Sequence, residues 1–401
     1  MDYNKLFSLV VSRSKASAIR ELLKVISRPE IISFAGGLPD PDLFPTQDVA
    51  DIMAEVVKTS PKEALQYGTT EGQGTLKKEL VKLLKETENI DAKPEQLLVV
   101  SASQQALDMT ARLFVNPGDS IITASPTYLG ALQAFQVVGA HIVGAESDAY
   151  GILPEDLEAK LEGLKNQGKQ CKFVYLVPDF QNPTGTTIPE KRRQEILEIV
   201  KKYDTFILED SPYRQVRFEG KSPRTFYEID GGQGNVITMF TFSKVFVPGF
   251  RLGFILGPEE VIRKYVILKQ AIDLCTSPIL QLATAEYLRR GLLQAHVNKI
   301  IDSYREKRDL MLKTLAEYMP KNISWTRPEG GLFLWLTLPK HMDATALLPK
   351  AIENKVAFVA GVDFYPAGDV YNDMRLNFSY SSKEQIVEGL KRLAQTIKEN
   401  L

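Results

Sequence analysis

The chain has 401 residues, of which 44% are hydrophobic and 25% are charged, and its formal net charge is −1 at pH 7. This composition is typical of a globular protein with a large core, and the near-neutral charge argues against a nucleic-acid partner or an anionic membrane surface. No stretch approaches the ~18 consecutive apolar residues of a membrane span.

Cysteine, histidine and the N-terminal residues narrow the protein class further. Cys171 and Cys275 are the two cysteines, and two cysteines do not make a disulfide framework. His141, His296 and His341 are widely separated and lack the spacing of zinc ligands. The opening run MDYNKLFSLVVSRSK has no long apolar segment of the kind found in cleavable signals. We therefore expect a cytoplasmic protein without a bound metal.

Seven short apolar runs predict the strands of one sheet. They span residues 97–100, 121–124, 141–143, 173–177, 206–208, 236–242 and 252–256. Helical patterns such as QQALDMTARLF and PEKRRQEILEIVKKY lie between most of them. This alternation is typical of an α/β fold around a mostly parallel sheet, in which ligands bind at the carboxyl ends of the strands.

The pattern changes after about residue 290. A long amphipathic helix is predicted over 297–315, followed by the strand-like run GGLFLWLTL, a helix in ATALLPKAIENK, a short strand in VAFVA and a terminal helix in KEQIVEGLKRLAQTIKEN. We therefore expect a large domain at residues 46–290 and a smaller α+β domain at 291–401. Residues 1–45 are expected to pack with the smaller domain.

Polar residues follow several of the predicted strands. Asn182 stands in an Asn-Pro-Thr-Gly turn, and Asp210 and Tyr213 follow the run TFILED. The strand at 97–100 turns through small residues into a helix that begins near Ser103. Such a helix start offers free N–H groups and the positive end of the helix dipole to a phosphate, although Ser103 could equally be a plain N-cap.

Lys244 is the candidate reactive group. It lies in the run VITMFTFSKVFVPGFRLGF, at the end of an apolar strand. Apolar surroundings favour the neutral amine, which is the form that makes a Schiff base with a carbonyl cofactor. Thr241, Ser243 and Arg251 stand close to it in sequence and have the chemistry to hold a phosphate. A surface lysine after a strand is the alternative interpretation of Lys244 alone.

Together, four runs of the chain resemble one family. They are FVYLVPDFQNPTG, TFILEDSPYRQV, VITMFTFSKVFVPGFRLGF and DMRLNFS, and their order and gaps match over nearly the whole chain. The family is the class I aminotransferases that depend on pyridoxal 5'-phosphate, which have fold type I. The resemblance implies a large domain with a mostly parallel seven-stranded sheet and a smaller α+β domain.

The resemblance also implies roles for residues around the cofactor. Lys244 matches the lysine that binds pyridoxal phosphate covalently and shuttles a proton, and Asp210 matches the acid that keeps the pyridine nitrogen protonated. Asn182 and Tyr213 match the pair that contacts the phenolic oxygen, and Tyr128 matches an aromatic that stacks on the ring. Phosphate contacts would come from Ser103, Gln104, Thr241, Ser243, Arg251 and Tyr67. Since Tyr67 matches a residue that reaches the neighbouring subunit's cofactor, a homodimer with shared active sites is implied.

Substrate residues follow from the same resemblance. Arg375, with Asn182, matches the clamp for the substrate α-carboxylate, and Gly37 matches a glycine that lines the pocket near it. The run KASAIRELLKVISRPEIISFAGGLPDPDLFP is similar to the 2-aminoadipate and kynurenine aminotransferase branch, where Ser17 and Arg20 would meet a distal carboxylate. A solvated helix arginine is the alternative interpretation of Arg20.

The expected activity is amino transfer from glutamate, 2-aminoadipate, or aromatic or branched-chain amino acids to a 2-oxo acid such as 2-oxoglutarate, with ping-pong kinetics. A β-eliminating C–S lyase or a decarboxylase on the same fold would keep the same cofactor residues. A transcriptional regulator with an aminotransferase-like domain is a further alternative, and it would need an additional DNA-binding module.

Overall fold

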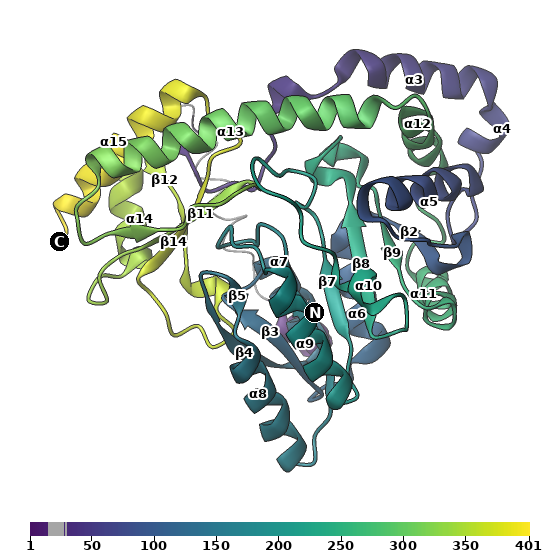
Figure 1. The fold of residues 1–401 in the computed structure, drawn as a ribbon, viewed down its shortest axis with the longest axis horizontal. Helices are drawn as coiled ribbons and strands as arrows, with labels where there is room; N and C mark the ends of the chain where they lie inside the picture. The colour runs from purple at the N-terminus through teal and green to yellow at the C-terminus, as the bar shows by residue number, and fades with distance from the viewer. Residues whose placement is uncertain (15–27, 29) are drawn as a thin grey trace.

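The computed structural model describes residues 1–14, 28 and 30–401. Its central feature is an eight-stranded sheet with the strand order β2-β9-β8-β7-β6-β3-β4-β5 (Figure 1). The sheet contains all seven predicted strands: β2 (Leu97–Val100), β3 (Ser120–Ser125), β4 (His141–Asp148), β6 (Cys171–Leu176), β7 (Ile207–Asp210), β8 (Val236–Thr241) and β9 (Gly253–Leu256). An eighth strand, β5 (Gly151–Ile152), extends the edge, so the seven-stranded prediction is short by one two-residue strand.

The middle of the sheet is parallel, as predicted from its apolar strands. Parallel pairs join β4 to β3, β3 to β6, β6 to β7 and β7 to β8, whereas β9 runs antiparallel to both β2 and β8. Every residue of β2, β7 and β9 is buried. Burial on both faces explains their continuous apolar runs, because helices cover both faces of such a sheet.

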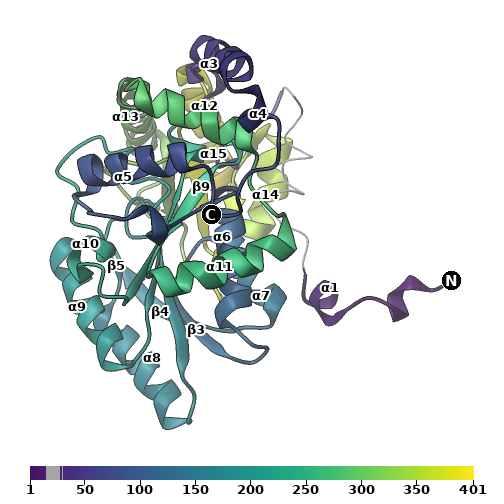
Figure 2. The same ribbon diagram turned by 90° about the vertical axis from the view of Figure 1, so that its right-hand side faces the viewer.

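Helices α8, α9 and α10 lie on one side of this sheet, and α6, α7 and α11 lie on the other (Figure 2). Helices α5 and α12 pack against each other beside it. The bounds of these helices are α5 (Gly74–Glu88), α6 (Ala102–Phe114), α7 (Leu129–Val138), α8 (Pro154–Asn166), α9 (Glu190–Lys202), α10 (Phe226–Asp230), α11 (Glu259–Ile272) and α12 (Pro278–Arg289).

A four-stranded antiparallel sheet forms the second part of the fold, beside the large sheet in Figure 1. Its order is β10-β11-β14-β13, with β10 (Ser324–Trp325), β11 (Phe333–Thr337), β13 (Val359–Ala360) and β14 (Asp373–Asn377). The long helix α13 (Leu292–Tyr318) packs on α15 (Lys383–Lys398), and α14 (Ala344–Glu353) packs on α15 as well. The amphipathic pattern predicted this long helix, but β14 was not predicted.

Residues 32–34 contact this second part, whereas α1 (Leu9–Arg13), nearer the start of the chain, packs on α7 beside the large sheet. Strand β1 (Ile32–Ser33) pairs in parallel with β12 (Val356–Ala357), and Asn377 donates its backbone N–H to the Phe34 carbonyl at 2.8 Å. The remaining α-helices of the described residues are α3 (Thr46–Thr59) and α4 (Pro61–Ala64). The division of the chain at residues 45 and 290 stays a prediction.

No helix within the described residues has both the length and the apolar character needed to cross a membrane. The same part of the chain contains no group of three or more His, Cys, Asp or Glu side chains arranged to hold a metal ion.

Candidate active site

Lys244 lies at the carboxyl end of β8, in a single turn of 3-10 helix, Phe242–Lys244. Its amine donates a hydrogen bond to the backbone carbonyl oxygen of Gly37 at 2.9 Å. Burial, together with the positive charges of Arg375 and Arg251, lowers the pKa of Lys244 to about 8. About a tenth of this amine is therefore neutral at pH 7, far more than for an ordinary lysine, and the neutral form is the one that attacks a carbonyl.

Asp210 ends the neighbouring strand β7 and is buried. The Tyr175 hydroxyl donates a hydrogen bond to its Oδ2 at 2.9 Å, while Oδ1 is buried without a partner among the described residues. Burial raises the pKa of Asp210 to about 7, although the nearby hydroxyls of Tyr175 and Ser103 act in the opposite direction. A buried carboxylate with one free oxygen is suited to a cationic N–H donor, because a positive partner offsets the cost of burying the charge.

Arg375 is the central residue of β14 and is fully buried. It donates from Nη1 to the Asn182 Oδ1 at 2.8 Å and from Nη2 to the Ala35 carbonyl at 2.7 Å. Its guanidinium lies 4.3 Å from the ring centre of Phe333 and 5.2 Å from that of Phe364. Nε is buried with no hydrogen-bond partner in the described part of the chain. Burial lowers the pKa of Arg375 to about 10, so at pH 7 it is a positive charge without an anionic partner among the described residues.

Asn182 and Tyr213 join the loops that follow two adjacent strands, β6 and β7. The Asn182 Nδ2 lies 3.4 Å from the Tyr213 hydroxyl, and both side chains are buried. The Tyr213 ring meets the ring of Phe333 edge to face, with 5.8 Å between ring centres. Asn182 thus contacts both Arg375 and Tyr213, and the structure brings these three predicted residues together.

The predicted phosphate cup has two sides. On one side, α6 begins at Ala102, whose φ of +61° lies in the left-handed region that favours glycine. The backbone at the start of α6 lies close to that of Gly253 in β9. A Cβ added to Gly253 would lie 2.5 Å from the Phe240 carbonyl oxygen and 3.1 Å from the Ala102 Cα. The next residue, Ser103, has a buried hydroxyl with no partner within the described residues.

The second side of the cup is a chain of hydrogen bonds. Thr241 Oγ1 donates to Ser243 Oγ at 2.9 Å, and Arg251 Nη1 donates to the same oxygen at 3.3 Å. Hydroxyl and guanidinium donors of this kind bind phosphate well. The resemblance predicts phosphate contacts for all three residues.

Other predicted residues are less closely tied to this cluster. Gln104 is exposed, and its amide donates to the Gly130 carbonyl at 3.2 Å. The ring of Tyr128 lies over Gly130, where an added Cβ would come within 2.5 Å of it. Tyr67 is 79% exposed, and no hydrogen bond joins its side chain to the cluster within the described residues. Ser17 and Arg20 lie outside the described residues.

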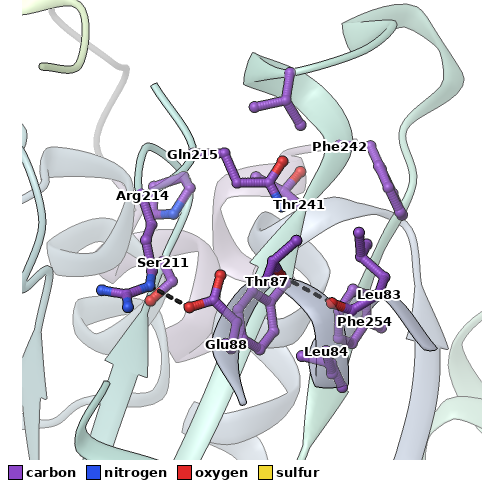
Figure 3. Close-up of a pocket in the computed structure, with 13 residues that line it drawn as sticks. Leu83, Leu84, Thr87, Glu88, Ser211, Arg214, Gln215, Thr241, Phe242 and Phe254 are labelled. Carbon is purple, nitrogen blue, oxygen red and sulfur yellow. Dashed lines mark hydrogen bonds and ion pairs between the residues drawn. The ribbon is translucent and has the colours of Figure 1, made fainter. Parts of the chain in front are cut away.

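Thr241 is one of the residues that line a small cavity (Figure 3). It has a volume of about 30 Å³ and is lined by residues that include Ser211, Arg214, Glu88 and Phe254. This volume suits one water molecule and is far too small for an amino acid. The cavity is therefore not the substrate pocket.

Three contributions to the site were missed from the sequence. Tyr175 lies inside an apolar strand. A buried tyrosine hydroxyl needs a polar partner, so a tyrosine in this run could have indicated a nearby polar group. Phe333 packs against both Arg375 and Tyr213, yet its run GGLFLWLTL indicates only a strand. The Ala35 carbonyl binds Arg375 through its backbone, which leaves no side-chain signal at all.

A family model described as aminotransferase class I and II matches residues 30–393. The chain belongs to this family. The aminotransferase is 45% identical over 401 residues to aromatic-amino-acid aminotransferase 1 of Thermococcus litoralis, with 100% of this chain and 96% of the relative covered.

Two solved structures share the whole fold with this aminotransferase. The kynurenine aminotransferase of Pyrococcus horikoshii has a TM-score of 0.96 and 44% identity, with 100% of this chain and 98% of that chain covered. The α-aminoadipate aminotransferase of Thermus thermophilus has a TM-score of 0.91 and 35% identity, with coverage of 100% and 99%. The first was solved with PMP, and the second with N-(5'-phosphopyridoxyl)-L-leucine.

Pyridoxal phosphate is the cofactor of this aminotransferase, and the site fits it. When bound, it supplies an electrophilic carbonyl carbon and an electron-withdrawing pyridine ring. The free Asp210 Oδ1 suits the ring N–H, and the free Ser103 hydroxyl at the start of α6 suits the phosphate. Both are buried polar atoms without a hydrogen-bond partner among the described residues, and a bound cofactor would supply one.

Proposed function

We propose that this aminotransferase moves the amino group of glutamate, 2-aminoadipate and aromatic or branched-chain amino acids to a 2-oxo acid such as 2-oxoglutarate. The observation that carries this is the buried guanidinium of Arg375, whose Nε has no partner among the described residues and which lies near the rings of Phe333 and Phe364. Its planar fork suits the α-carboxylate that all these substrates share. The names of the relatives, which cover aromatic, kynurenine and aminoadipate aminotransferases, support the substrate range.

The roles of the cofactor residues are part of the proposal. Lys244 holds the cofactor covalently and, once released, moves a proton at the substrate α-carbon. Asp210 keeps the proton on the pyridine nitrogen, while Asn182 and Tyr213 donate hydrogen bonds to the phenolic oxygen. Tyr128 stacks on the ring. The phosphate is bound by Ser103, Gln104, Thr241, Ser243 and Arg251.

The residues around the substrate side chain are proposed to distinguish dicarboxylic from apolar substrates. Arg20, with Ser17, accepts the distal carboxylate of a dicarboxylic substrate and moves aside for apolar side chains. Gly37 lines the pocket near the α-carboxylate, where an added Cβ would lie 3.2 Å from the Phe333 ring. A larger residue at Gly37 would press against this ring, which also contacts Arg375.

We further propose a cytoplasmic homodimer in which Tyr67 completes the partner's cofactor site. The exposure of Tyr67 supports this, because its hydroxyl is available to a second chain. One cofactor serves two half-reactions, so the kinetics should be ping-pong, with one substrate released before the next binds.

The absorbance spectrum of the purified holoenzyme tests the function directly. Glutamate alone should convert the cofactor band to that of the amine form, and 2-oxoglutarate should restore it. A band that glutamate leaves unchanged would exclude glutamate as donor. Release of pyruvate and ammonia from cysteine derivatives, without any return of the band on adding an oxo acid, would contradict amino transfer in favour of lyase chemistry.

A further inference from the structure

Asp179 is a buried carboxylate outside the cofactor cluster that contacts three guanidinium groups. Arg193 of α9 donates from Nη2 to its Oδ1 at 2.7 Å, and Arg214 donates from Nη1 to its Oδ2 at 3.1 Å. The Nη2 of Arg217 lies 3.9 Å from its Oδ1. Burial by itself works to raise the pKa of Asp179, but Arg193 and Arg214 outweigh it and lower that pKa. Asp179 is therefore ionised at neutral pH.

Arg193 fixes one side of this carboxylate. Its side chain is completely buried and also donates to three backbone carbonyls, those of Ile188 at 2.8 Å, Arg224 at 3.0 Å and Pro178 at 3.2 Å. A guanidinium whose donors are all engaged in this way has little freedom to move. Asp179 is thus held on a rigid anchor supplied by α9.

Arg214 ties the second loop to the same carboxylate. It directly follows Tyr213, and its Nε pairs with Glu88 at the end of α5, so its guanidinium lies between two buried carboxylates. Figure 3 shows this arginine pointing towards Glu88 beside the small cavity. Burial raises the pKa of Glu88, with Arg214 acting in the opposite direction, so the two carboxylates are unequal and Asp179 is the firmly charged partner.

The Asp179–Arg214 pair therefore connects the loop after β6, which carries Asn182, to the loop after β7, which carries Tyr213. These two side chains lie within 3.4 Å of each other. Buried ion pairs add little net stability compared with apolar residues of the same volume, but they define a geometry. A geometric role is the better account of a buried charge cluster placed at this point of the fold.

We propose that Asp179 is a positioning residue for the cofactor: through Arg214 it sets the separation of Asn182 and Tyr213, and thereby the hydrogen bonds that they donate to the cofactor's phenolic oxygen. This rests on the roles given to Asn182 and Tyr213 in the proposed function. Donors aimed at that oxygen favour its ionised form and lower its affinity for protons. Misplaced donors should leave the proton more tightly bound.

The test is a pH titration of the absorbance of the holoenzyme carrying Asp179→Asn. The midpoint of the cofactor's spectral change should move up by about one unit, the size expected for weakening a hydrogen bond to a charged oxygen. The kcat should fall about tenfold, and the KM of the amino acid should change less, because Asn182 shifts but the Arg375 guanidinium that holds the α-carboxylate remains. Tyr213→Phe in the same assay shows the shift that follows from losing one donor outright.

Asp230→Asn is the matched control. Asp230 is also a buried aspartate, bonded to the backbone N–H groups of Gly234 and Asn235 and to the Asn235 side chain, and within the described residues no hydrogen bond or ion pair joins it to the loops after β6 and β7. This variant should lose stability without any change in midpoint. If Asp179→Asn does not fold, Arg214→Lys carries the test, because it keeps the charge but loses the fork that spans Asp179 and Glu88.

The outcomes separate the two proposals. A shift in Tyr213→Phe without one in Asp179→Asn or Arg214→Lys would overturn the positioning role and leave the role of Tyr213 standing. No shift in Tyr213→Phe would overturn both. An equal shift in Asp230→Asn would show a general effect of lost stability and would also overturn the positioning role.

Discussion

The Lys244 amine donates a hydrogen bond to the carbonyl oxygen of Gly37, a residue 207 positions earlier in the chain. Two residues before Gly37, the Ala35 carbonyl accepts a hydrogen bond from Arg375. One short backbone segment thus binds both the reactive amine and the guanidinium proposed to hold the substrate. Because backbone carbonyls orient these cations without adding a negative charge, burial still lowers the pKa of both.

The first prediction concerns Lys244. In the cofactor-free protein, the rate of covalent cofactor attachment should rise with pH through a midpoint near 8, because only the neutral amine attacks the carbonyl carbon. Stopped-flow absorbance measures this rate. Lys244→Ala should still bind the cofactor without a covalent bond and lose about 10²–10⁴ in kcat. A rate that still increases steeply above pH 10 would contradict the lowered pKa.

The second prediction is that Asp210→Asn stabilises the cofactor-free protein. The pKa of Asp210 is about 7 in the folded chain, above its value in the unfolded chain. The folded state therefore binds more protons between these two pKa values, and the free energy of unfolding falls as pH rises towards about 7 and through it. Asparagine does not ionise, so the variant avoids this fall in the free energy of unfolding. Its Tm at pH 8 should therefore be higher by about 2–4 °C, with a smaller gain at pH 5.

Activity should move in the opposite direction in the same variant. Without the carboxylate, the pyridine nitrogen loses its partner, and kcat should fall by about 10²–10³. Thermal unfolding at the two pH values, alongside kcat, checks both parts. A Tm at pH 8 below that of the unmodified protein would show that Asp210 is not destabilised by burial.

The third prediction separates substrate binding from cofactor binding. Arg375→Lys keeps the charge but loses the planar fork, so kcat/KM should fall about 10- to 100-fold for the amino acid and for the oxo acid. Cofactor affinity should stay unchanged. Arg251→Lys is the matched control, because Arg251 contacts Ser243 in the phosphate cup and its loss should weaken cofactor binding with little effect on KM. The reverse pattern would exchange the two assignments.

The fourth prediction tests the distal carboxylate pocket. Arg20→Ala should raise the KM for glutamate about tenfold and leave that for leucine nearly unchanged, because leucine has no distal charge to bind. Leucine is thus an internal control for folding and cofactor content. Steady-state kinetics with glutamate and with leucine measure both KM values. An equal change in the two KM values would favour the alternative that Arg20 is a solvated helix arginine.

The fifth prediction concerns the shared site. If Tyr67 serves the partner's cofactor, mixing inactive Lys244→Ala with Tyr67→Ala at limiting cofactor should restore activity. Each mixed dimer then combines one doubly defective site with one intact site, because the two residues of a site come from different chains. Refolded mixtures with differently tagged chains allow the mixed dimer to be purified and assayed. Mixed dimers without restored activity would show that Tyr67 does not cross to the partner.

Much of the fold was predictable because burial leaves a local pattern. The seven strands of the large sheet were found from their apolar runs, and the long helix from its amphipathic spacing. Strand β5 was not predicted because two residues are too few to show a periodic pattern. Strand β14 was not predicted because Asp373, Arg375 and Asn377 alternate with apolar residues, which is typical of a surface strand. All five residues of β14 are buried, which only its partners on both sides could reveal.

The sequence alone predicted Lys244, Asp210, Asn182 and Arg375 as site residues, because the order and gaps of the four runs that contain them resemble one family. Tertiary structure decided how they behave. The Tyr175 hydroxyl selects which Asp210 oxygen is free, the Gly37 carbonyl orients the amine, and Asp179 joins the two loops that bear Asn182 and Tyr213. These effects come from burial and from contacts between residues far apart in the chain, and a pKa depends on such surroundings more than on neighbours in sequence.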